Sequence, residues 1–171
     1  MRKRLLIAIL LAAGAGLAAG LIVLYLLPLE SSPASPEQPL PFSHRLHAGT
    51  NQIDCEFCHR AVRSSPVAGI PSVATCRACH LYIAQDRPAI KALLQYWQRQ
   101  EPIPWVRVHK LPDHVYFPHM MHLRAGLGCS DCHGQVQTME RLTRVAVLKM
   151  GWCLNCHQKR GVSVDCWTCH I

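Results

Sequence analysis

The sequence has few acidic residues and few aromatic ones. Ten Asp and Glu stand against 18 Lys and Arg, and aromatic residues make up 6% of the chain. The formal net charge is therefore +8. Nowhere do the basic residues form a run with interleaved aromatic side chains, which is the pattern typical of a nucleic-acid-binding surface. We therefore expect no nucleic-acid partner.

No cysteine stands outside a repeated motif. The chain contains five copies of Cys-x-x-Cys-His, and these account for all ten cysteines. The cysteines are Cys55, Cys58, Cys76, Cys79, Cys129, Cys132, Cys153, Cys156, Cys166 and Cys169. The histidines that close the motifs are His59, His80, His133, His157 and His170.

This motif has the groups that covalent haem attachment needs. Two thiols can form thioethers with the porphyrin vinyl groups, and the adjacent imidazole can reach the iron from one face. Zinc sites also use Cys-x-x-Cys, and an even number of cysteines is compatible with disulfides. Neither alternative explains why a histidine always follows. The sequence therefore predicts five covalently bound haem c groups.

The length of the chain limits the fold class. Roughly 130 residues remain for five haems, or about 26 residues each, too few for separate apolar cores. We expect a multihaem cytochrome c fold, with mostly irregular loops and short α-helices wrapped around stacked haems. One N-terminal transmembrane helix is expected in addition.

The N-terminus predicts a membrane anchor. Arg2, Lys3 and Arg4 precede 25 residues without charge, residues 5–29. Such a run can cross about 30 Å of hydrocarbon, and the basic leader places the N-terminus in the cytoplasm. A cleaved secretory signal is the alternative, with small residues at 12–20 as cleavage sites. We favour a retained single-pass anchor in the inner membrane, with the haem domain in the periplasm, because the apolar run continues past Gly20.

Three segments are expected. Residues 1–29 form the leader and anchor. Residues 30–41 contain four prolines in twelve residues and predict an extended linker. Residues 42–171 form the pentahaem domain, with two modules at about 42–80 and 105–171.

Six further histidines are candidate iron ligands on the opposite haem face. Four occur in a duplicated pattern, Phe-x-His-x-x-His, that precedes a haem motif in each module and is followed by Ala-Gly. Two histidines on one helical turn cannot approach one iron from the same side, so they must serve different haems. We expect His44 and His119 to bind the iron of their own following motif. His47 and His122 are expected to bind more distant ones.

The ligand of the fifth haem stays open at this point. His109 and Met150 are equal candidates, while His114 and Met139 are weaker ones. A thioether ligand would raise the reduction potential relative to a second imidazole.

Between the modules, an amphipathic helix is expected to begin at residues 86–88, where Pro88 suits the first turn. It should end before Pro102 and act as a scaffold. The apolar residues at core spacing are Ile90, Leu93, Leu94 and Trp97.

Four stretches resemble a known family: residues 51–55, 69–73, 105–122 and 150–153. They are similar to the pentahaem, membrane-anchored cytochrome c component of alternative complex III, and the paired histidines resemble the wider class III (c3/c7) cytochromes. The resemblance implies a quinol-oxidising complex. Its partners there would be an iron–sulfur subunit, together with a monohaem cytochrome, a soluble carrier or an oxidase.

Two other functions compete with an electron-relay subunit. One is a stand-alone, membrane-anchored quinol dehydrogenase that feeds a periplasmic reductase. The other is a catalytic multihaem reductase. Catalysis at iron needs an open coordination position, whereas this chain has at least as many spare axial donors as motifs. We therefore expect electron transfer and no catalytic residue.

Overall fold

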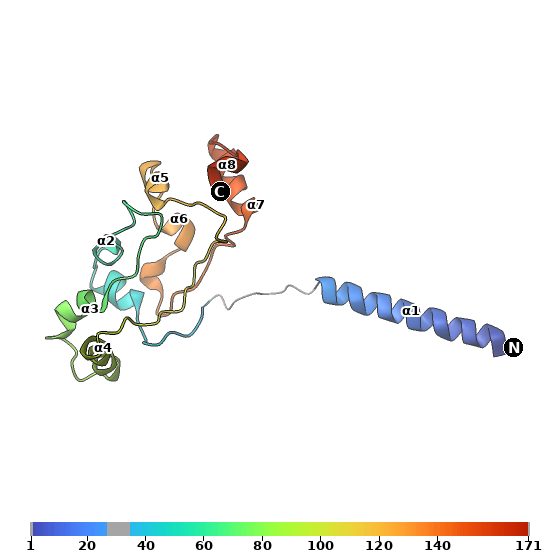
Figure 1. Ribbon diagram of the computed structural model, residues 1–171, viewed down its shortest axis with the longest axis horizontal. Helices are drawn as coiled ribbons and strands as arrows, with labels where there is room; N and C mark the ends of the chain where they lie inside the picture. The colour runs from blue at the N-terminus through green and yellow to red at the C-terminus, as the bar shows by residue number, and fades with distance from the viewer. Residues whose placement is uncertain (1, 27–34, 171) are drawn as a thin grey trace. The chain divides into compact units, whose positions relative to one another are not determined.

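The chain divides into two units, residues 1–33 and residues 34–171. The computed structural model describes residues 2–26 and 35–170 (Figure 1). Residues 27–29 of the expected anchor and residues 30–34 of the expected linker lie outside the described residues. The two units are considered separately below.

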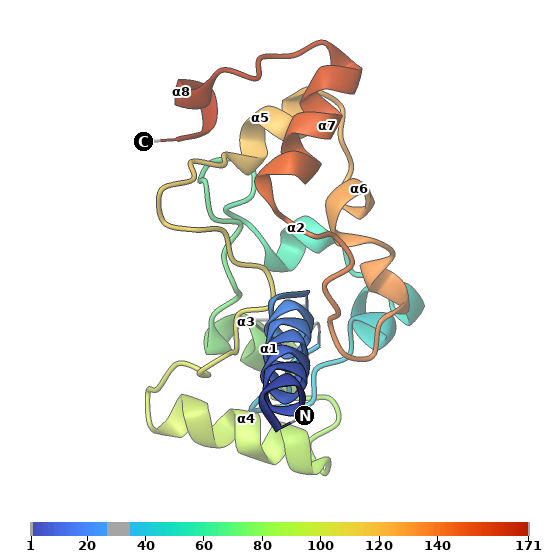
Figure 2. The same cartoon turned by 90° about the vertical axis from the view of Figure 1, so that its right-hand side faces the viewer.

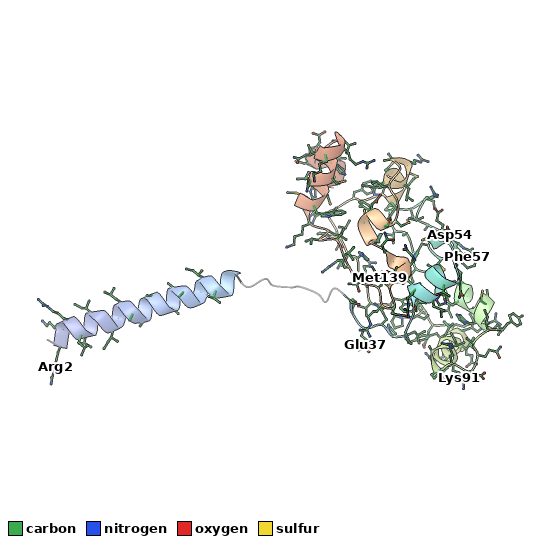
Figure 3. All side chains as sticks on the ribbon, turned by 180° about the vertical axis from the view of Figure 1, so that it is seen from behind. Arg2, Glu37, Asp54, Phe57, Lys91 and Met139 are labelled. Carbon is green, nitrogen blue, oxygen red and sulfur yellow. The ribbon has the colours of Figure 1, made fainter. Side chains whose placement is uncertain are left out.

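The first unit contains one helix, α1 (Arg2–Leu26), of 25 residues. At 1.5 Å per residue it is about 37 Å long, more than the roughly 30 Å of a bilayer core. An 18-residue window within its segment Arg2–Val23 has a mean hydropathy of 2.6. Figure 3 shows Arg2 at one end of this helix. The helix is therefore long and apolar enough to cross a membrane, as a retained anchor or a secretory signal would be.

The second unit consists of short helices joined by irregular segments. Residues 35–170 contain no strand, only an isolated bridge between Val115 and His170. This confirms the expected combination of short helices and loops. The helical elements are η1 (Arg45–Thr50, a π-helix), α2 (Cys55–Cys58), α3 (Val73–His80), α4 (Pro88–Gln98), α5 (His119–Arg124), α6 (Ser130–His133), η2 (Val136–Thr138, a 3-10 helix), α7 (Met150–Arg160) and α8 (Cys166–Cys169).

Local sequence explains where several of these helices begin and end. The Asp54 carboxylate accepts a hydrogen bond from the Glu56 N–H at 2.7 Å and so caps α2. Pro88 occupies the first turn of α4, where its missing N–H costs nothing. Gly161 ends α7 in the left-handed region with a φ of 63°, a conformation that glycine adopts without strain.

The amphipathic helix expected between the modules is confirmed as α4. Leu93 is only 4% exposed and packs with Leu40 and Ile103, which are also buried. Trp97 was expected in this core, but it is 41% exposed. The helix turns Tyr96 toward the core, and the Trp97 ring lies at its edge, 4.6 Å from the Arg77 guanidinium.

The polypeptide core is small. Among the described residues only four apolar side chains are buried, namely Leu40, Leu93, Ile103 and Ala146. A chain of this length would need a far larger apolar core to fold by itself. The small core therefore agrees with a fold organised around prosthetic groups.

The second unit is extended in one direction. In Figures 1 and 2, α3 and α4 lie at one end and α7 and α8 at the other, with α2 and α6 between them. Figure 3 shows Lys91 on α4 and Phe57 on α2. The helices that carry the five motifs are thus spread along the whole unit.

Candidate haem sites

All five motifs are built on helical turns. Positions i, i+3 and i+4 of a helix share one face, so both thiols and the imidazole of a motif point the same way. In three motifs the histidine N–H closes the turn on the carbonyl of the first cysteine, at 2.9–3.0 Å. These pairs are His59 with Cys55, His133 with Cys129, and His170 with Cys166. This is the arrangement that two thioether bonds and one axial nitrogen require.

The zinc and disulfide alternatives find no support in the described residues. No disulfide joins any of the ten cysteines, and no three His, Cys, Asp or Glu side chains of residues 2–26 and 35–170 converge as metal ligands.

The duplicated Phe-x-His-x-x-His pattern keeps its geometry in both modules. Phe42 meets His44 edge-on at 4.9 Å and stacks on His47 at 4.5 Å. Phe117 meets His119 edge-on at 5.0 Å and lies against His122 at 4.3 Å. In both modules the phenyl ring therefore contacts both imidazoles of its pair, meeting the first edge-on and the second with more nearly parallel planes.

The backbone of the two repeats differs at the expected Ala-Gly turn. Gly126 follows α5 with a φ of 81°, as a turn glycine does. Gly49 lies within η1, and a side chain there would collide with the backbone carbonyl of Gln137. Glycine is therefore needed for conformation in one repeat and for close approach in the other.

Three of the four repeat histidines lie opposite a motif histidine. The ring centroids are 6.0 Å apart for His47 and His80, 6.4 Å for His119 and His133, and 6.2 Å for His122 and His157. Two imidazoles that bind one iron from opposite sides have their ring centroids about 6 Å apart. Each metal–nitrogen bond contributes about 2 Å, and each ring adds roughly 1 Å from its nitrogen to its centre. The spacing fits one iron atom between each pair.

His44 lies close to His59. Its pKa is lowered to about 4, first by burial and then by the neighbouring charges of His59 and His47. Neutral imidazole is the form that binds iron. The structure thus brings His44 to the motif that follows it and His47 to the next one.

Hydrogen bonds at Nδ1 set the tautomer of most of these histidines. A carbonyl oxygen only accepts, so each Nδ1 beside one carries the proton and leaves Nε2 free for a metal. His59 donates to Gly69, His80 to Ile83 and His157 to Ser163, at 2.7–3.2 Å. The repeat histidines that do the same are His47 to Ser43, His119 to Pro66 and His122 to Pro118, at 2.8–3.1 Å.

The side chain beside the fifth motif histidine is that of His114. The centroids of the His114 and His170 rings are 5.5 Å apart, and their planes are inclined by 23°. The backbone holds this contact, because the Tyr116 N–H donates to the Cys169 carbonyl at 2.8 Å and Val115 bridges to His170. His114 was the weaker histidine candidate from the sequence.

The other three candidates lie elsewhere. The Met150 side chain is 64% exposed. Met139 lies beside η1, where its carbonyl accepts from the Arg45 N–H at 2.9 Å (Figure 3). His109 contacts His133, with ring centroids 4.4 Å apart and its Nε2 3.3 Å from the Nδ1 of His133. That separation leaves no room for an iron atom between the two rings.

The duplication does not decide this choice. The fifth motif has no counterpart in the first module, and neither do His109 and His114, since positions 34 and 39 hold Ala and Pro. The same is true of Met139 and Met150, since positions 64 and 75 hold Ser and Thr. Sequence comparison of the two modules therefore does not separate the four candidates.

The first motif has the second and third motifs as its neighbours in space. Burial raises the pKa of Cys76, and the nearby Cys58 adds to the shift. Burial also raises the pKa of Cys55, and the nearby Cys129, a residue of the third motif, raises it further. The first motif therefore lies between the second and the third.

The remaining motifs continue this row. The pKa of Cys132 is raised mainly by burial, then by the charge of Asp131 and then by that of Cys156, a residue of the fourth motif. The pKa of Cys153 is raised mainly by burial and then by Cys169, a residue of the fifth motif. The spatial order is second, first, third, fourth, fifth, in agreement with the order of the helices in Figures 1 and 2.

Comparison with known proteins agrees with this geometry. Residues 115–171 match the family model described as cytochrome c7 and related cytochrome c. Over 98 residues the chain is 32% identical to a protein of Nitratidesulfovibrio vulgaris named menaquinone reductase, multiheme cytochrome c subunit. The similarity covers 57% of this chain and 46% of that relative, so the chain spans less than half of the relative's length.

The donor set fits haem c. Paired thiols on one helical face, neutral imidazoles with a protonated Nδ1, and imidazole pairs about 6 Å apart are what bis-histidine haem needs. The fold class is that of a multihaem cytochrome c. Covalently bound haem would supply one-electron exchange at iron, and the paired cysteines and the histidines of this chain would hold and orient it.

Proposed function

We propose that this multihaem cytochrome is the membrane-anchored electron-relay subunit of a quinol-oxidising respiratory complex. It carries five haem c groups, one for each Cys-x-x-Cys-His motif, and has no catalytic residue of its own. Helix α1 anchors it to the inner membrane, and the second unit lies on the periplasmic side.

One observation carries this proposal: the five motifs form an unbroken row. The turn with His44 and His47 joins the first and second sites, and the turn with His119 and His122 joins the third and fourth. The His119 ring also donates to Pro66 of the first module at 2.8 Å, which ties the two modules together. A continuous row of sites suits a relay, whereas a catalytic reductase needs one open site.

The proposed axial ligands are one histidine on each face of every haem. The motif histidines bind one face, and His44, His47, His119 and His122 bind the opposite face of the first four haems. For the fifth haem we propose His114 in place of His109 and Met150, because of its 5.5 Å approach to His170. With both axial positions of all five haem irons occupied, no coordination position would remain for a substrate.

The direction of electron flow admits a second candidate. The resemblance to the pentahaem component of alternative complex III favours oxidation of quinol. The donor would then be an iron–sulfur subunit, and the acceptor would be a monohaem cytochrome or an oxidase. The relative from N. vulgaris is named a menaquinone reductase subunit, which favours the opposite direction. A row of bis-histidine haems can carry electrons either way.

The test is purification of the protein from its native membrane in mild detergent. A defined complex with an iron–sulfur subunit, whose haems are reduced by a quinol analogue, supports the proposal. Haems that are reduced only by a soluble donor, with quinone as the final acceptor, favour the second candidate. A protein that oxidises the quinol analogue without any partner would overturn the assignment to a larger complex.

A further inference from the structure

His133 differs from three of the other motif histidines in its Nδ1 partner. The Nδ1 groups of His59, His80 and His157 face backbone carbonyls. The Nδ1 of His133 faces the Nε2 of His109 at 3.3 Å, with the two rings nearly perpendicular at 82°. A side chain therefore takes the place that the main chain fills in those three motifs.

Iron binding at His133 determines which of the two facing nitrogens carries the proton. When the Nε2 of His133 binds iron, its Nδ1 carries the only ring proton and must donate. The Nε2 of His109 then accepts, so the proton of neutral His109 lies on its own Nδ1.

His109 is not placed to bind the same iron. The ring of His119 lies 6.4 Å from that of His133, the separation expected of two ligands of one iron, with nearly parallel ring planes inclined by 11°. The two axial positions of that haem are then filled. His109 can act on the iron only through the ring of His133.

We propose that His109 is a positioning residue, which orients the His133 imidazole and lowers the reduction potential of the haem held by Cys129 and Cys132. This rests on the proposed haem coordination. An acceptor at Nδ1 makes the imidazole a stronger donor to iron and stabilises the ferric state. The third motif joins the two modules, so the potential set here governs exchange between them.

The experiment uses the full-length haem-loaded protein in detergent, with His109→Phe and His109→Gln variants. The Phe variant removes the acceptor, while the Gln variant keeps an amide oxygen within reach. We expect both to retain five low-spin haems. One potential should rise in the Phe variant by up to about tenfold in the reduction equilibrium, which is about 59 mV for one electron. The Gln variant should give a smaller rise, and Lys110→Ala, in the same loop, should give none.

Potentiometric titration with parallel electron paramagnetic resonance distinguishes the outcomes. Unchanged potentials in both variants would overturn the inference and leave the proposed relay intact. A high-spin haem in either variant would also overturn it, because His109 would then be an axial ligand. If the Phe variant does not assemble, a rise in the Gln variant supports the inference and an unchanged potential overturns it. A parent protein with no haem on the third motif would overturn both proposals.

Discussion

Replacing His114 by Ala tests which side chain completes the fifth haem. The ring of His114 lies 5.5 Å from His170, whereas Met150 is 64% exposed and His109 faces His133. If each of the five motifs has one distal ligand, as proposed, loss of His114 should convert one haem in five from low-spin to high-spin. The high-spin fraction is thus about 20% of the ferric haem, since the other four pairs do not involve this residue.

Quantitative electron paramagnetic resonance of the ferric full-length protein measures that fraction. The same variant should bind cyanide rapidly at one haem, because one axial position becomes open. Met150→Leu is the matched control and should leave all haems low-spin, with no thioether charge-transfer band in the parent protein. A high-spin haem in the Met150 variant, or none in the His114 variant, would refute the reasoning from ring distances.

Three further predictions concern stability and assembly. Leu93→Ala should cost about 3 kcal/mol of unfolding free energy, as a buried leucine in a small core does, while the exposed Lys91→Ala on the same helix should stay within about 0.5 kcal/mol; equal midpoints in denaturant titrations would contradict the packing of α4. Gly49→Ala should cost about 1–3 kcal/mol because the new methyl group meets the Gln137 carbonyl, and an unchanged melting temperature would argue against that contact. Mass spectrometry should find five covalently attached haems in the parent protein and four after both cysteines of the last motif are replaced; any other pair of counts would contradict one haem for each motif.

The duplication shows where sequence reasoning succeeds. The Phe-x-His-x-x-His pattern is local, so its aromatic contacts recur in both modules at nearly the same distances. Helix α4 was predictable for the same reason, because Pro88 and the spacing of apolar residues act within three turns. Trp97 was predicted less well, since its exposure depends on how α4 is rotated against α3.

Sequence by itself determined the cysteine motifs, the paired histidines, the apolar N-terminal helix and the multihaem fold class. Each of these depends on residues within a few helical turns of one another, where spacing sets geometry. Only the tertiary structure decided that the first motif lies between the second and third, and that His114, not His109, lies beside His170. Those outcomes depend on contacts between distant segments, such as the bridge from Val115 to His170, whose register no local spacing specifies.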